Sequence, residues 1–270
     1  MKPKKVAGKP VQKKQSLFIK SLRLAKSNPG KAGLMILFDF LFAVSAFFAM
    51  PNLSSYLAKI IVDSQITLTP LIFIMFSSVY YLTVLLIYSF FKYSVLDLLK
   101  SLFEKTGFSY NRLWQFYALN IVIAGIFLAI VLVLNFILAN MKQDFAPFAF
   151  IFFAIPFVLS LYAVINISHT LFYQGLSFLD SIKKGFEIAF TKIKFYREIV
   201  LFTILTALLL FAIFTGIGYL LNFIASKNYA MYLNLYGYFS RASVVVSDLA
   251  LYFVVFINRI SFYDVIRENK

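Results

Sequence analysis

The 270-residue chain lacks cysteine and has a single histidine, His169. The missing cysteine excludes disulfides, thiolate metal sites and a cysteine nucleophile. One histidine excludes a metal site built from several imidazoles of the same chain. The sequence also lacks a Gly-rich phosphate loop, a His-Glu-x-x-His pattern and a Gly-x-Ser-x-Gly pattern. We therefore expect no cofactor and no bound metal, and the chain carries no recognisable enzyme signature.

Charge is scarce as well. Only 14% of the residues are charged, 61% are hydrophobic, and the mean hydropathy is +0.85. Soluble domains average about a quarter charged residues, so lipid must be the solvent for much of this chain. Apolar stretches predict six membrane-spanning helices, each long enough for a ~30 Å hydrocarbon core. They lie at about 33–50, 70–91, 113–138, 146–172, 198–222 and 242–260, and Pro51 is expected to close the first.

The formal net charge of +15 is distributed unevenly. Segments 1–31, 92–112, 174–198 and 259–270 hold 22 of the 26 Lys and Arg residues. The positive-inside rule therefore predicts a multi-pass protein of the cell membrane with both termini in the cytoplasm. The basic charge marks topology and an inner face suited to anionic lipids, and it requires no nucleic acid partner.

The chain begins with a strongly basic segment. Residues 1–15 contain six lysines together with Pro, Gly and Gln, which predicts a disordered basic tail. Residues 16–26 place apolar side chains on one side and cations beside them, which is typical of an amphipathic helix lying in the membrane interface. Residues 16–270 are expected to form a single six-helix membrane domain.

The pattern Ser-φ-φ-Asp-x-[Leu/Ile]-[Lys/Arg], with φ an apolar residue, occurs three times, and its aspartates lie 83 and 84 residues apart. Each copy follows a long apolar stretch, so we predict an all-α fold of three hairpin repeats, at about 16–91, 94–172 and 177–260. Amphipathic interfacial helices are expected on the cytoplasmic face. The defining residues are Ser94, Asp97 and Lys100; Ser177, Asp180 and Lys183; and Ser261, Asp264 and Arg267.

Serine followed three residues later by an acid is a capping-box arrangement, which marks the start of a helix. We interpret each copy as the start of a surface helix where the chain leaves the bilayer. These helices are expected at 97–106 and 180–195, with a fragment of a further one after residue 264. The alternative interpretation is a ring of three Asp–Lys/Arg pairs that acts as a gate.

Two acids, Asp39 and Asp248, lie within predicted spans, where a carboxylate costs roughly 2.5–3.5 kcal/mol on insertion scales. Their depths are similar, so the two side chains are expected to be able to meet. Asn120 occupies in the third span the place of Asp39 in the first, and Asn166 and His169 lie at the inner end of the fourth. These residues either fix helix packing through hydrogen bonds or form a proton-linked or cation-binding site.

The segment 177–197 resembles a known family. It begins Ser-Phe-Leu-Asp-Ser-Ile-Lys-Lys-Gly-Phe-Glu, and it is similar to an element of uncharacterised prokaryotic six-span membrane proteins and of the membrane domain that precedes some glycerophosphodiester phosphodiesterases. In that domain a Ser-Phe-x-x-[Ala/Ser]-[Leu/Ile]-[Lys/Arg] start opens a basic surface helix. The resemblance implies a helical membrane fold and brings no catalytic residues.

Three functional hypotheses remain open on the sequence. The first is an integral membrane protein without catalytic chemistry that organises anionic lipids or a partner membrane protein at the cytoplasmic face. The second is a small-solute transporter or permease, proton-linked through Asp39 and Asp248. The third, an intramembrane enzyme built from these acids and His169, lacks a recognisable nucleophile–base pair.

Overall fold

The computed structural model describes residues 16–63, 69–142, 144–225 and 229–268, so the predicted tail at 1–15 lies outside the described residues. In the described ranges the chain forms eight α-helices and no strand. They are α1 (Leu17–Ser27), α2 (Pro29–Asp63), α3 (Pro70–Ser101), α4 (Tyr110–Ala139), α5 (Ala146–Tyr173), α6 (Phe178–Thr191), α7 (Ile193–Ala225) and α8 (Tyr229–Glu268). Six of these helices are long and apolar enough to cross a membrane. The predicted all-helical fold with six candidate membrane spans is thereby confirmed.

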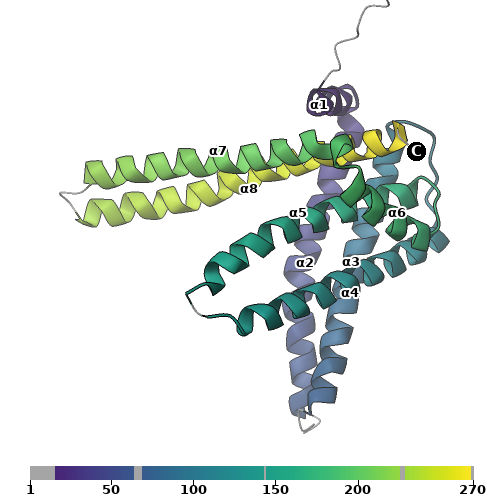
Figure 1. The fold of residues 1–270 in the computed structure, drawn as a ribbon, viewed down its shortest axis with the longest axis horizontal. Helices are drawn as coiled ribbons and strands as arrows, with labels where there is room; N and C mark the ends of the chain where they lie inside the picture. The colour runs from purple at the N-terminus through teal and green to yellow at the C-terminus, as the bar shows by residue number, and fades with distance from the viewer. Residues whose placement is uncertain (1–15, 64–68, 143, 226–228, 269–270) are drawn as a thin grey trace, which may run out of the picture.

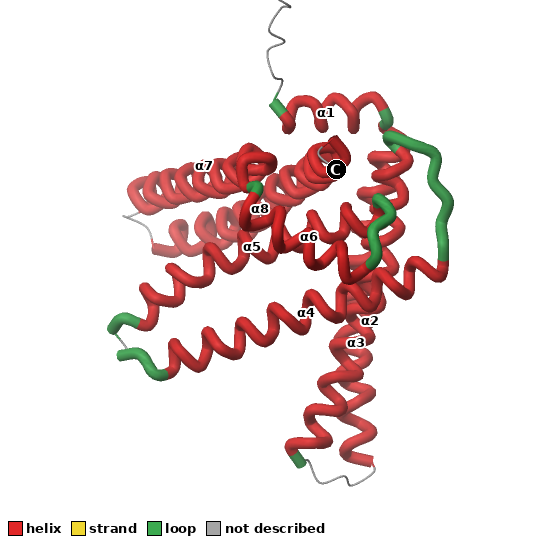
Figure 2. The backbone as a smooth tube through the Cα atoms, turned by 45° about the vertical axis from the view of Figure 1, so that its right-hand side comes forward, coloured by secondary structure: helices red, strands yellow, loops and turns green. Residues whose placement is uncertain are grey.

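The long helices form three hairpins, α2–α3, α4–α5 and α7–α8, which meet at one end (Figure 1). We call this end, where α1 and α6 also lie, the base. The opposite ends of the hairpins point in different directions (Figure 2). The equivalence of the three hairpins as repeats, and an interfacial position of α1 and α6, stay predictions.

The packed core lies in the base. Its largest fully buried side chains come from α2, α3, α4, α5 and α8, and they include Met35, Tyr93, Phe116, Ile167, Phe172, Ile257 and Tyr263. Toward the far ends of the hairpins large apolar side chains are exposed instead, such as Phe47, Phe136 and Phe223. Soluble proteins rarely expose apolar surface on this scale, which agrees with a lipid environment for the far ends.

Three predicted helix boundaries are wrong. Helix α2 continues through Pro51 to Asp63, because a proline kinks or weakens a helix without ending it when lipid or packing supports both sides. Helix α3 continues to Ser101, and residues 102–109 form no separate surface helix. Helix α8 continues as far as Glu268, so no further helix begins after residue 264.

The predicted capping motif is correct at Ser177 only. There the Asp180 amide donates to Ser177 Oγ at 3.2 Å, and the hydroxyl donates to Asp180 Oδ2 at 2.7 Å. Ser94 and Ser261 lie inside α3 and α8. Their hydroxyls donate to the backbone carbonyls four residues earlier, at 2.9 and 3.1 Å, as serines inside helices do. The prediction of a helix start is therefore wrong for these two copies.

The residue two positions before the serine explains the difference. In the second copy it is Gly175, whose φ of +107° is a conformation that glycine adopts readily, and it follows directly on the end of α5. The first and third copies have Lys92 and Arg259 at this position, and both are helical. Without a glycine the helix continues through the motif.

The predicted ring of three ion pairs is not formed. Asp264 and Arg267 pair at 3.1 Å. Asp97 accepts a hydrogen bond from the Tyr173 hydroxyl at 2.7 Å instead of pairing with the cation three residues later. Lys183 is exposed and forms no ion pair with a described residue. The gate interpretation of the motif is therefore not supported by its side-chain contacts.

A candidate polar site between the hairpins

Asp39, on α2, is held by two residues of α8. Arg259 Nη1 donates to both carboxylate oxygens, at 3.1 and 2.9 Å, and the Tyr252 hydroxyl donates to Oδ2 at 2.9 Å. Tyr252 and Arg259 are seven residues apart, so they lie on the same face of the helix. The side chains of Arg259 and Asp39 are only 11% and 20% exposed. Because a cation accompanies it, the carboxylate remains tolerable in an apolar environment.

A cavity of about 270 Å³ adjoins this pair. Four helices line it. Each helix contributes side chains that are three or four positions apart in the sequence, so these side chains lie on the same face of that helix. The polar residues in its wall are Asp39, Tyr88, Lys92, Tyr162, Asn166 and Arg259. They come from α2, α3, α5 and α8, so the cavity lies where all three hairpins contribute.

Two cationic groups in the cavity wall have unused hydrogen-bonding capacity. Lys92 forms no hydrogen bond or ion pair with a described residue. Arg259 Nε is buried and has no hydrogen-bond partner among the described residues. The lining residues include two cationic side chains, Lys92 and Arg259, and one carboxylate, Asp39, so the formal charge of the wall is +1. The arrangement is therefore suited to an anion.

The expectation that Asp39 and Asp248 can meet is not fulfilled. Asp248 is exposed on α8 and does not line the cavity, and the partners of Asp39 on that helix are Tyr252 and Arg259. The sequence does not single out Lys92 and Arg259, because each follows directly on an apolar stretch. Both therefore belong to the basic segments that are predicted at the membrane surface. Their shared position, two residues before the motif serine, was the available signal.

Asn120 and His169, both predicted as intramembrane polar candidates, are brought together. Asn120 Nδ2 donates to Ser89 Oγ at 2.9 Å, and Asn120 Oδ1 lies 2.7 Å from His169 Nε2. The imidazole therefore carries its hydrogen on Nε2, and Nδ1 is an acceptor without a partner among the described residues. All three side chains are buried. These contacts link α3, α4 and α5 and favour the packing interpretation for this pair.

Asn166 belongs to both the cavity and its own helix. Its Nδ2 donates to the Tyr162 carbonyl one turn earlier, at 2.8 Å, while its side chain contributes to the cavity wall. In the described ranges no three His, Cys, Asp or Glu side chains lie close enough together to hold a metal ion.

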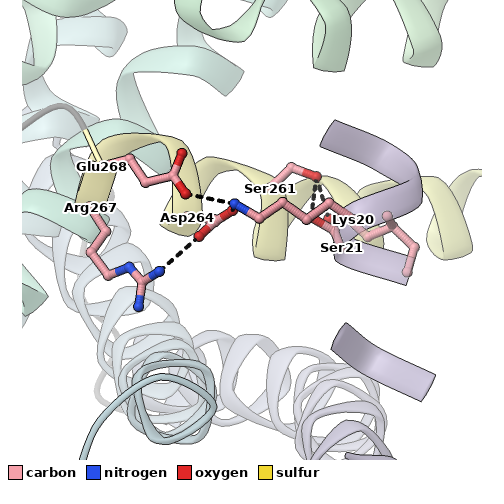
Figure 3. A network of polar contacts seen from close by, with 7 residues as sticks. Lys20, Ser21, Ser261, Asp264, Arg267 and Glu268 are labelled. Atoms are coloured by element: carbon pink, nitrogen blue, oxygen red, sulfur yellow. Dashed lines mark hydrogen bonds and ion pairs between the residues drawn. The ribbon is translucent and has the colours of Figure 1, made fainter. Parts of the chain in front are cut away.

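A second polar network fixes α1 to the end of α8 (Figure 3). Lys20 Nζ lies 2.5 Å from Asp264 Oδ2 and 2.6 Å from Glu268 Oε1. Ser21 Oγ and Ser261 Oγ lie 2.8 Å apart, within hydrogen-bond distance. The hydrogen bond to Asp264, and next that to Glu268, raises the pKa of Lys20 above its ordinary value. This network positions α1 at the base.

We expect α1 to stay docked from neutral pH to about pH 10 and to loosen at higher pH. A raised pKa means that the Lys20 contacts contribute fully below the ordinary lysine pKa of about 10.4 and are lost as pH rises through the raised value. The distance between spin labels on cysteines introduced at Arg23 and Leu249 reports docking, because the chain has no cysteine of its own. Lys20→Met should loosen α1 already at neutral pH. An unchanged distance in this variant would contradict the role of Lys20.

Comparison of the chain with protein-family models, with curated proteins and with solved structures yields no match in any of the three.

Proposed function

We propose that the chain is an integral membrane protein that binds anionic lipids at its base and catalyses no reaction. The observation that supports this proposal most strongly is the position of exposed cations on the two short helices, α1 and α6. Arg23 and Lys26 on α1 and Lys183 and Lys184 on α6 are exposed. Each Lys or Arg near an anionic leaflet contributes about 1 kcal/mol of attraction.

The orientation that fits this function places the base at the cytoplasmic face of a cell membrane. The positive-inside rule supports it, since the segments at the base hold most of the cations. Acidic membrane-protein partners would be attracted by the same surface. The resemblance of segment 177–197 to the membrane domain preceding some phosphodiesterases supports a prokaryotic six-span family without catalysis by this domain.

The association of spin-labelled phosphatidylglycerol with the reconstituted protein, relative to spin-labelled phosphatidylcholine, tests the proposal. Lys183→Gln/Lys184→Gln should weaken the preference by up to about 2 kcal/mol, roughly 30-fold. The matched control is Lys59→Gln/Lys142→Gln, which removes the same charge from exposed positions away from the base. Equal losses in both double variants, or no preference in the unaltered protein, would refute a lipid-binding base.

A transporter is the second candidate, and the cavity beside Asp39 favours it. Asp248 lies outside this cavity, so a proton-linked path would depend on Asp39 alone. If the chain transports a solute, Asp39→Asn should abolish flux in liposomes, whereas Asp248→Asn should leave it unchanged. Retained flux in the Asp39 variant would exclude the proton-linked form of this hypothesis.

A further inference from the structure

We propose that the cavity between the hairpins binds one phosphate group of a single negative charge through Lys92 and Arg259. This site goes beyond lipid attraction at the base, because it uses none of the exposed cations of α1 and α6. The cavity lies among α2, α3, α5 and α8 and has a volume of about 270 Å³.

The charges of the wall determine the sign of the ligand. Asp39 is engaged by Arg259 Nη1 and by the Tyr252 hydroxyl, so its negative charge is already compensated. Lys92 adds a second cation that forms no ion pair with a described residue. A lone cation in a low-dielectric environment is costly, and an anion in the cavity would relieve this cost.

The available donors indicate the chemistry of the anion. A lysine ammonium has three N–H donors, and Arg259 keeps a buried Nε–H without a partner among the described residues. The Tyr88 hydroxyl, one turn before Lys92 in the same wall, also forms no hydrogen bond with a described residue. Donors on three lining side chains, two from α3 and one from α8, suit a group with several acceptor oxygens, and a phosphate provides them.

The size of the cavity restricts the ligand further. Its volume of about 270 Å³ lies just below the ~300–1,000 Å³ typical of sites for drug-sized ligands, so it suits a small group such as a single phosphate. The net wall charge of one matches the single charge of a phosphodiester headgroup or of dihydrogen phosphate. These two sources share the same chemistry, and the experiment must separate them.

The test titrates the purified full chain in phosphatidylcholine nanodiscs with inorganic phosphate, and separately with dioctanoyl phosphatidylglycerol. We expect saturable binding of at least one probe, with an affinity lowered about tenfold or more in Lys92→Gln. Lys92→Arg, which keeps the charge, should bind within a few-fold of the unaltered protein. The matched control is Lys59→Gln, which removes one exposed charge of α2 outside the cavity wall and away from the base, and it should change the affinity less than about twofold.

Each outcome decides the question. Binding of phosphate that depends on Lys92 supports the site with a free anion as ligand. Binding of the lipid probe alone supports it with a headgroup as ligand, provided that this binding also depends on Lys92. If Lys92→Gln does not fold, Tyr88→Phe takes its place and should lower the affinity several-fold. The site is refuted if neither probe binds the unaltered protein, or if Lys92→Gln and Lys59→Gln have equal effects. A refuted cavity site combined with a preserved lipid preference at Lys183 and Lys184 would leave the proposed function intact.

Discussion

Arg259→Met is expected to lower the free energy of unfolding by about 3–5 kcal/mol, because it leaves the Asp39 carboxylate without its cation. In the folded protein Arg259 reaches both carboxylate oxygens, and both side chains are largely buried. After the substitution only the Tyr252 hydroxyl would still contact Asp39. Unfolding in mixed micelles, followed by the fluorescence of the single tryptophan, Trp114 on α4, measures the loss.

Two further variants separate the ion pair from the bulk of the side chain. Asp39→Asn/Arg259→Met removes both charges and should recover most of the stability, since a neutral pair leaves no buried charge uncompensated. Arg241→Met changes an exposed cation of the same helix, and its effect should stay within about 0.5 kcal/mol. If the double variant is as unstable as Arg259→Met alone, packing of the arginine stem explains the loss and the ion pair does not.

The membrane helices could be predicted from the sequence because lipid imposes a minimum length on an apolar stretch. Six stretches satisfied this length, and six long apolar helices are observed. Their ends were predicted less well. The helices α2 and α8 extend beyond the apolar stretches, to Asp63 and Glu268. Hydrophobicity reports where lipid is the solvent. It does not report where a helix ends, because a helix can continue into water beyond its apolar part.

The seven-residue motif shows how a local pattern depends on its flanks. Similar sequences begin a helix at Ser177 and lie inside a helix at Ser94 and Ser261. A serine hydroxyl can accept from a backbone amide or donate to a carbonyl one turn earlier, so the motif alone does not choose between the two. Gly175 decides, because it lets the chain turn after α5.

The candidate site was predicted in part for a related reason. Asp39 stood out because an acid within an apolar stretch is costly, and Asn120 and His169 stood out as polar residues within spans. Lys92 and Arg259 did not, since a long cationic side chain at the end of a span can reach either water or the protein interior. Which direction it takes depends on the neighbouring helices, and in this fold the nearby carboxylate of α2 attracts Arg259 inward.

Phe116→Ala is expected to destabilise the protein by about 3 kcal/mol, the lower end of the range for such truncations in a core. Phe116 is fully buried on α4, with ring centroids 4.7 Å from His169 and 5.7 Å from both Tyr93 and Phe172. The transfer of the ring from water contributes little in a membrane, because lipid is also apolar. The loss comes from the cavity and from the dispersion contacts of the ring, which lipid cannot replace inside the base.

Phe136→Ala is the matched control, because it removes the same ring from the same helix at a position where the side chain is 73% exposed. There lipid can fill the vacated space, so the free energy of unfolding should change by no more than about 0.5 kcal/mol. The same unfolding assay applies to both variants. A large effect of Phe136→Ala would mean that the far ends of the hairpins pack against one another in the bilayer. A large effect of Phe116→Ala alone would mean that packing in the base holds the fold together. The far ends of the hairpins would then contact lipid and not one another.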